Sequence, residues 1–204
     1  KQDILDNGGH LDTGIFGTQF FFEVLADNGL NDLAFEAMNK RDYPSFGLWI
    51  AQGATTTWEQ WNGDNSRNHP MFGGGLTWFY RKLAGMNADP EQPGYKHIIF
   101  RPQPVGDITE ARYEKLTPYG KSSIKKKKKD ICFSMTVVVP VGSTATVYVP
   151  IMEDSKATIV DGQGACSTYE GTENGYEKYI VSSGKYTFTS HLNHATYDDP
   201  IYFL

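Results

Sequence analysis

The residues most suited to chemistry gather in one stretch, GATTTWEQWNGDNSRNHPMFGGG, at residues 53–75. It places the carboxylate of Glu59 between Trp58 and Trp61, with Trp49 upstream. Indole rings combine a large apolar area with a polar edge, which suits stacking against the C–H face of a sugar ring. Side chains able to hydrogen-bond sugar hydroxyls follow; they are Asn62, Asp64, Asn65, Arg67, Asn68 and His69. The pattern indicates a carbohydrate site.

Glycoside hydrolysis fits such a site. The reaction needs two carboxyl groups, one to protonate the leaving oxygen and one to activate water or attack directly, and Glu59 is a candidate for one of them. The alternative is structural, because Trp58 and Trp61 also have the i, i+3 spacing of core residues, and Glu59 would then only cap the following turn. Composition and spacing leave both interpretations open.

Three other groups of residues carry weaker indications. His191 and His194 have an H-x-x-H spacing, but solvent-exposed side chains in a tail explain this pair better than a metal site does. The glycines at residues 73–75 lack the Lys and Ser/Thr that follow a phosphate loop, so they indicate close backbone approach. Asp12 and Thr13 precede a helix, where capping is expected and a substrate contact is the alternative. Nothing in the sequence indicates a metal or a cofactor.

Helical periodicity surrounds the Glu59 stretch. Helices are expected within residues 18–29, 31–46 and 73–90. Thr18 and Asn31 are the expected N-caps, Pro44 ends any helix before it, and Gly85 with Pro90 closes the third helix. The side chains expected to face the core are Phe21, Phe22, Val24 and Leu25, then Leu33, Phe35, Ala37 and Met38.

After Pro90 the pattern changes to short segments of alternating polarity, separated by Gly, Pro and Asn. Several such segments in succession predict an antiparallel β-sandwich. The segment VVVPVGSTATVYVP predicts a hairpin of two strands, and the run Lys125–Lys129 predicts a solvated hairpin turn. The expected domains are residues 1–90, residues 91–190 and a tail at 191–204.

Composition limits the classes of function. The chain has 204 residues and a net charge of −5, which argues against general nucleic-acid binding. No apolar run approaches the roughly 20 residues of a membrane-spanning helix, and the two cysteines fit neither a metal spacing nor a disulfide framework. The compartment is not indicated. Because Lys1 is not an initiator methionine and the helices would leave a broad apolar surface wet, we expect further helices N-terminal to Lys1.

Five separated segments carry a family resemblance. They are LDTGIFGTQFFFEVLADNGLNDLAFEAMNKRDYPSFGLWIAQGATTTWEQWNG, SRNHPMFGG, GLTWFYRKLAGM, PGYKHIIFRPQP and TPYGKSS. Together they extend through most of residues 11–150 and look like the C-terminal part of the bacterial inverting α-L-rhamnosidases. The resemblance implies an α+β multidomain fold, in which the terminal helices of an (α/α)6 barrel precede an antiparallel β-sandwich.

The resemblance also implies roles for individual residues. Glu59 matches the general base that activates water, Trp58 and Trp61 match its flanking aromatics, and His69 matches a histidine of the sugar pocket. With Asn68 and Trp49, these residues are the expected substrate-binding set for a rhamnose-containing glycoside or polysaccharide. The acidic, arginine-rich motif of the general acid has no match here. The acid is therefore expected from the remainder of the catalytic domain N-terminal to Lys1, and the chain alone is expected to be inactive.

Two further hypotheses remain. One keeps the helical barrel with a different sugar, because a fold alone does not fix the substrate. The other is a non-catalytic carbohydrate-binding or interaction module, which predicts that residues 91–190 alone bind sugar. A panel of aryl glycosides separates the first from a rhamnosidase, and a binding assay on the sandwich tests the second.

Overall fold

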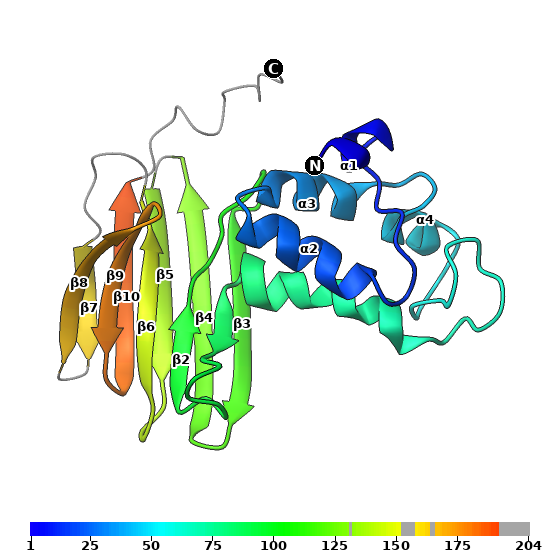
Figure 1. Ribbon diagram of the computed structural model, residues 1–204. Helices are drawn as coiled ribbons and strands as arrows, with labels where there is room; N and C mark the ends of the chain where they lie inside the picture. The colour runs from blue at the N-terminus through cyan, green and yellow to red at the C-terminus, as the bar shows by residue number, and fades with distance from the viewer. Residues whose placement is uncertain (131, 152–157, 164–165, 192–204) are drawn as a thin grey trace. The chain divides into compact units, whose positions relative to one another are not determined.

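The computed structural model describes residues 1–130, 132–151, 158–163 and 166–191. The chain divides into two units, residues 1–79 and 80–204. The helices and helical segments are α1 (Gln2–Asp6), α2 (Thr18–Asp27), α3 (Asn31–Asn39), α4 (Phe46–Ala51), the 3₁₀ segment η1 (Pro70–Leu76) and the π-helical segment η2 (Phe79–Leu83). Figure 1 shows α2 and α3 side by side in the first unit.

Helices α2 and α3 form where helical periodicity predicts helices, with differences at the caps. The single helix expected within residues 73–90 is wrong, because this stretch contains the end of η1, then η2 and a short strand at residues 86–88. Thr18 begins α2 and donates its hydroxyl to the Gly14 carbonyl at 2.9 Å, so it does not cap the helix. Asn31 begins α3 without capping it, because its Oδ1 accepts a hydrogen bond from Trp78 Nε1 at 2.7 Å. Periodicity did not predict α4, whose cap is Ser45: the Ser45 hydroxyl accepts a hydrogen bond from the Leu48 backbone amide at 3.0 Å.

The buried faces also differ in part from the prediction. In α2, Phe22 and Leu25 are buried as expected, whereas Val24 is exposed. The Phe22 ring lies 6.5 Å from Phe46 and 6.4 Å from Trp78. In α3 the buried residues are Leu33, Ala34 and Ala37. Periodicity identifies a broad apolar stripe, but the neighbouring elements decide which part of it is covered.

The glycines at residues 73–75 lie in η1, against α2. A Cβ on Gly74 would lie 2.5 Å from Gln19 Cβ, and one on Gly75 would lie 2.9 Å from Phe22 Cε2. Both distances are too short for real contacts, so these positions need glycine. The prediction of close backbone approach is confirmed for Gly74 and Gly75 but not for Gly73, where a Cβ would have nothing within 4 Å.

Residues 80–204 contain a sandwich of two five-stranded sheets (Figure 1). The strands are β1 (Met86–Ala88), β2 (His97–Phe100), β3 (Glu110–Thr117), β4 (Gly120–Lys129), β5 (Cys132–Val139), β6 (Thr144–Pro150), β7 (Thr158–Gln163), β8 (Ser167–Glu173), β9 (Tyr176–Val181) and β10 (Gly184–His191). One sheet has the order β1-β2-β6-β9-β8 and the other β3-β4-β5-β10-β7. The pairing is antiparallel except between β2 and β6, which run parallel. Strand β1 lies N-terminal to the boundary predicted between residues 90 and 91.

The core of the sandwich lies between the two sheets and is mainly aliphatic and aromatic. Its fully covered side chains include Ile98, Phe100, Ile124, Met135, Val137, Val147 and Phe188. Strict alternation along β5 and β9 places every second side chain in this core. The sequence pattern predicted these strands correctly because alternation follows directly from the pleat of the backbone.

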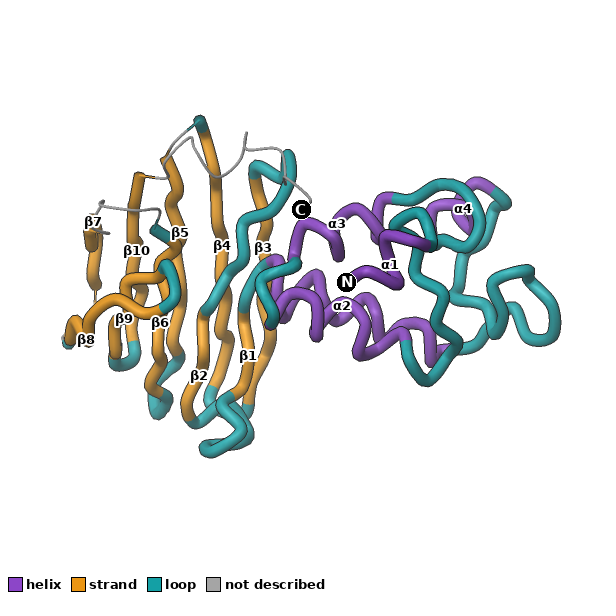
Figure 2. The backbone as a smooth tube through the Cα atoms, turned by 45° about the horizontal axis from the view of Figure 1, so that its top comes forward, coloured by secondary structure: helices purple, strands orange, loops and turns teal. Residues whose placement is uncertain are grey.

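Two predictions for the sandwich are wrong. The segment at residues 137–150 is not a hairpin, because β5 pairs with β4 and β10 whereas β6 pairs with β2 and β9 in the other sheet. The run Lys125–Lys129 is not a turn but the end of β4 (Figure 2): all five residues pair with β5, and the first three also pair with β3. Lys126 is buried within it. Cys132 and Cys166 are exposed thiols, and Cys132 begins β5. His191 ends β10, and His194 lies outside the described residues.

Candidate active site

Glu59 lies on a loop whose two arms run antiparallel. The Glu59 amide donates to the Ser66 carbonyl at 2.8 Å, and the His69 amide donates to the Thr57 carbonyl at 2.8 Å. The Ser66 amide returns a hydrogen bond to Oε2 of Glu59 at 3.1 Å. Backbone and side chain of Glu59 are thus both tied to the opposite arm. The side chain remains half-buried, so its carboxylate keeps a path to solvent.

The tryptophans around Glu59 form a core rather than an exposed platform. Trp49, Trp58 and Trp61 are 2%, 4% and 8% exposed. The Trp61 ring lies 4.5 Å from Trp49 and 4.4 Å from Phe72, and Trp49 Nε1 donates to the Trp61 carbonyl at 2.9 Å. The structural alternative therefore describes Trp58 and Trp61 correctly as core residues, and Trp49 joins them, since large indole rings gain most by burying one another.

A pocket of about 280 Å³ lies beside this aromatic core. Its lining residues are Asp12, Thr13, Gly14, Tyr43, Glu59, Gln60, Trp61, Asn62 and Phe72. Glu59 and Trp61 are the two predicted site residues that it brings together. Trp61 is fixed there by a hydrogen bond from Nε1 to the Thr13 carbonyl at 2.9 Å. Tyr43 and Phe72 had not been predicted as site residues. Tyr43 lies outside the Glu59 stretch, and Phe72 lies within it but has no polar group that suggested a role.

The predicted histidine and asparagine lie on the second arm of the loop. His69 is half-buried, and the Thr57 hydroxyl donates to its carbonyl at 2.5 Å. Its Nδ1 is buried without a hydrogen-bond partner among the described residues. Asn68 is exposed, and its backbone amide donates to the Ser66 hydroxyl at 3.2 Å. Neither side chain lines the pocket of Glu59, although the loop pairing keeps both arms adjacent.

The other polar residues of the loop hold its shape. Asn62 Nδ2 donates to Asp64 Oδ2 at 2.8 Å. Arg67 Nε donates to the Gly63 carbonyl at 3.1 Å, and its guanidinium carbon lies 4.5 Å from the centroid of the Trp58 ring. Asn62 also lines the pocket of Glu59, and the expectation that these residues bind sugar hydroxyls stays a prediction.

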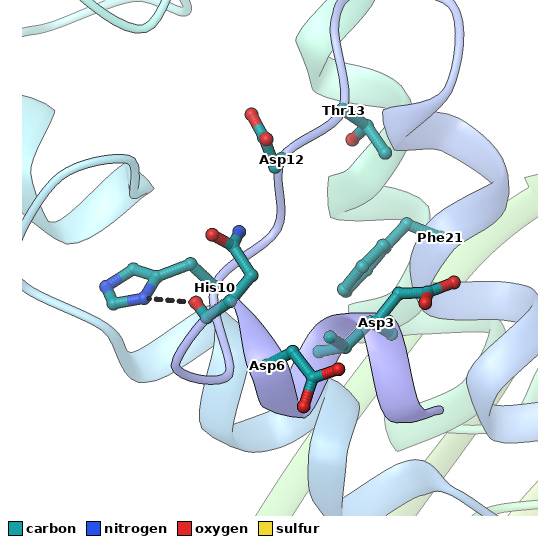
Figure 3. Close-up of a pocket in the computed structure, with 8 residues that line it drawn as sticks. Asp3, Asp6, His10, Asp12, Thr13 and Phe21 are labelled. Atoms are coloured by element: carbon teal, nitrogen blue, oxygen red, sulfur yellow. Dashed lines mark hydrogen bonds between the residues drawn. The ribbon is translucent and has the colours of Figure 1, made fainter.

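A larger cavity of about 590 Å³ lies next to α1 (Figure 3). Its lining residues are Asp3, Ile4, Asp6, Asn7, His10, Asp12, Thr13 and Phe21, so it shares Asp12 and Thr13 with the pocket of Glu59. His10 Nδ1 lies 3.2 Å from the Asn7 carbonyl and Nε2 lies 2.8 Å from the Asp42 carboxylate. The hydrogen bond from His10 lowers the pKa of Asp42 below its usual value.

Both cavities are lined by hydroxyl, amide, carboxylate and aromatic groups, which suits a polar organic ligand. Within the described part of the chain, no group of three or more His, Cys, Asp and Glu side chains is placed to hold a metal ion. The chemistry available beside Trp61 is that of a carboxylate positioned to accept a proton.

Comparison with known proteins gives a consistent family. The model of the bacterial alpha-L-rhamnosidase 6 hairpin glycosidase domain matches residues 1–83, and that of the bacterial alpha-L-rhamnosidase C-terminal domain matches residues 85–164. An alpha-L-rhamnosidase of Streptomyces avermitilis is 32% identical over 191 residues, which cover 88% of this chain and 18% of that protein. One from Formosa agariphila is 34% identical over 178 residues, which cover 80% and 19%.

Solved structures agree. The alpha-L-rhamnosidase from Dictyoglumus thermophilum has a TM-score of 0.82 at 38% identity, over 92% of this chain and 22% of that one. The Streptomyces avermitilis enzyme complexed with L-rhamnose has a TM-score of 0.82 at 31% identity, over 92% and 19%. These matches confirm the predicted resemblance and fold class. The chain spans about a fifth of the length of the relatives that it matches.

Proposed function

Because the chain belongs to the bacterial α-L-rhamnosidases, as the end of their six-hairpin domain followed by their C-terminal domain, we propose that it completes a catalytic domain that releases terminal α-L-rhamnose. The substrate is a rhamnose-containing glycoside or polysaccharide. The observation that carries this proposal is the carboxylate of Glu59, which lines a pocket beside Trp61 and is held by the Ser66 amide.

We assign Glu59 as the general base of an inverting hydrolysis. The hydrogen bond from Ser66 orients Oε2, and Oε1 takes the proton from the attacking water. In an inverting enzyme the acid and base carboxyl groups are about 6.5–9.5 Å apart, which leaves room for this water. The general acid comes from an earlier part of the six-hairpin domain, so residues 1–204 by themselves are inactive.

The substrate-binding set takes two kinds of role under this proposal. Trp61 forms the apolar wall against which the rhamnose ring stacks. His69 and Asn68 supply hydrogen bonds to sugar hydroxyls from the second arm of the loop, and the partnerless Nδ1 of His69 supports this assignment. Trp49 and Trp58, being buried, act by holding Trp61 and the loop in place.

Glu59→Gln in the full-length enzyme tests the base. The amide keeps the shape of the side chain but cannot accept the proton, so kcat on an aryl α-L-rhamnoside is expected to fall about 10²- to 10⁴-fold with little change in KM. Glu36→Gln is the control, because Glu36 is exposed on α3 away from the pocket. Turnover of Glu59→Gln near that of wild type would exclude Glu59 as the base.

A separate experiment measures the anomeric configuration of the released rhamnose. If the mechanism inverts, proton NMR of the wild-type reaction shows β-L-rhamnose first, and the α anomer appears only by mutarotation. Initial release of α-L-rhamnose would refute inversion while leaving the family substrate intact. Hydrolysis of another aryl glycoside in place of the rhamnoside would instead support the alternative of a different sugar.

A further inference from the structure

The outer face of the second sheet is rich in lysine. Alternation along β4 buries Ser122, Ile124 and Lys126 and points the intervening side chains outward. The register aligns these with outward residues of β3, so that Lys125 lies opposite Arg112 and Lys127 opposite Glu110. We define the lysine face by its described charged side chains: Lys121, Lys125, Lys127, Lys129, Arg112, Lys185, Glu110 and Glu114.

Positive charge exceeds negative charge on this face. Glu110 is shared by Lys125 and Lys127, whose Nζ atoms lie 3.2 and 3.5 Å from its oxygens. Glu114 is shared in the same way by Arg112 at 2.7 Å and Lys121 at 3.0 Å. Two carboxylates thus face four cations, while Lys129 and Lys185 add two more. This surplus contrasts with the net charge of −5 for the whole chain.

The lysines of the lysine face can exchange their carboxylate partners for another anion. The side chains of Lys125, Lys127 and Glu110 are each about half exposed, and exposed pairs of this kind contribute little to stability. The hydrogen bond from Lys125 lowers the pKa of Glu110, so this carboxylate stays ionised at neutral pH. An incoming anion can therefore compete for the lysines at little cost in stability.

Hydroxyl groups continue this surface across the neighbouring strands. Ser134 lies opposite Lys127 and Thr136 opposite Lys125 on β5, and Thr187 follows opposite Thr136 on β10. The hydroxyls of Thr136 and Thr187 are 3.0 Å apart. Along β4 the row from Lys121 to Lys129 extends about 27 Å at roughly 3.4 Å per residue. A flat row of this length fits an extended polymer better than a single small anion.

We propose that the lysine face binds an acidic polysaccharide, a chain of sugars that bears carboxylate or sulfate groups. The cations pair with its anionic groups, and the serine and threonine hydroxyls hydrogen-bond its sugar hydroxyls. The described side chains of this face include no aromatic ring on which bases could stack. The choice of a glycan over another polyanion rests on the proposed glycosidase function.

The test compares binding of the full-length enzyme to polygalacturonate and to neutral dextran at low salt. Lys127→Gln/Lys129→Gln removes two charges while leaving Lys125 on Glu110. It is expected to weaken polygalacturonate binding about three- to tenfold. The control Lys1→Gln/Lys40→Gln removes the same charge from residues 1–79 and is expected to bind as wild type does. Added salt is expected to weaken wild-type binding.

Turnover of a small aryl rhamnoside, measured for the same variants, separates this proposal from the proposed function. Both double variants are expected to hydrolyse it at the wild-type rate. Loss of polygalacturonate binding in the lysine-face variant alone supports the proposal even if no rhamnoside is cleaved. Unchanged binding in that variant, an equal loss in the control, or equal affinity for dextran would overturn it. Tighter binding of DNA or anionic vesicles would overturn the choice of a glycan.

Discussion

Arg67 holds the loop of Glu59 from two directions. Its guanidinium lies over the Trp58 ring, and its Nε donates to the Gly63 carbonyl. Gly63 has a φ of 82°, and a Cβ there would lie 2.9 Å from Trp58 Cζ3. Since Ser66, which binds the Glu59 carboxylate, directly precedes Arg67, movement of Arg67 displaces the partner of the proposed base. We regard Arg67 as a positioning residue.

Arg67→Met in the full-length enzyme is expected to lower kcat about 10- to 100-fold with KM nearly unchanged, because small displacements of a catalytic group carry costs of this order. Steady-state kinetics on an aryl rhamnoside measure it. Arg67→Lys keeps a cation over Trp58 but loses the hydrogen bond to Gly63, so its kcat is expected to lie between those of wild type and Arg67→Met. Equal kcat for all three proteins would show that Arg67 does not position Glu59.

At the level of the elements, β4 combines a polar outer face with a buried lysine. Lys126 is 3% exposed, and its Nζ donates to the Gln103 carbonyl at 3.4 Å. It is flanked by Ala111 on β3 and Met135 on β5. Burial, with a smaller contribution from Lys128, lowers the pKa of Lys126 from 10.5 to about 7. The fold therefore favours the neutral amine.

This lowered pKa makes stability depend on pH. Between about pH 7 and 10.5 the unfolded chain binds the Lys126 proton more tightly than the folded chain does, so the free energy of unfolding rises with pH. Below about pH 7 the destabilisation caused by burying the charged amine is fully present. Lys126→Met is expected to raise the free energy of unfolding of residues 1–204 by about 1–3 kcal/mol at neutral pH and to flatten this slope. Denaturant titrations across that pH range measure both effects. Lys129→Met, on the exposed face, is the control, and an unchanged pH slope in Lys126→Met would contradict the assignment.

At the level of the whole molecule, the exposed apolar side chains of residues 1–79 need a cover. Phe20 and Val24 on α2 are 60% and 55% exposed, and Ile50 on α4 is 73% exposed. Adjacent exposed side chains of this size are typical of surfaces that bind other protein segments. None of the described helices is long and apolar enough to cross a membrane. The remainder of the six-hairpin domain is the cover that we expect for these side chains.

The variant Phe20→Ser tests whether Phe20 is buried by the remainder of the six-hairpin domain or stays exposed to solvent. In residues 1–204 alone it is expected to change the free energy of unfolding by less than about 0.5 kcal/mol and to reduce self-association. In the full-length enzyme it is expected to destabilise by roughly 1.5–3 kcal/mol, because Phe20 is then buried. Thermal unfolding and light scattering measure the two proteins, with Glu36→Ser as the polar control. The same small effect in both proteins would show that Phe20 stays exposed.

The sequence by itself determined the types of most elements, the fold class and the family. Helical and two-residue periodicities are local properties of the backbone, so they can be recognised without knowing what an element packs against. The motif around Glu59 likewise identifies the loop, because its residues are consecutive. Its assignment as the base stays a prediction.

The tertiary structure decided what those elements bury and which strands they join. The rings of Trp49 and Trp61 both pack against Phe72. The indole of Trp61 also donates a hydrogen bond to Thr13, which is far from it in sequence. Strands β5 and β6 look like a hairpin but enter different sheets. A lysine run that looks like a turn is the end of β4, and pairing forces every second side chain inward. Burial depends on such distant neighbours, and local pattern carries no information about them.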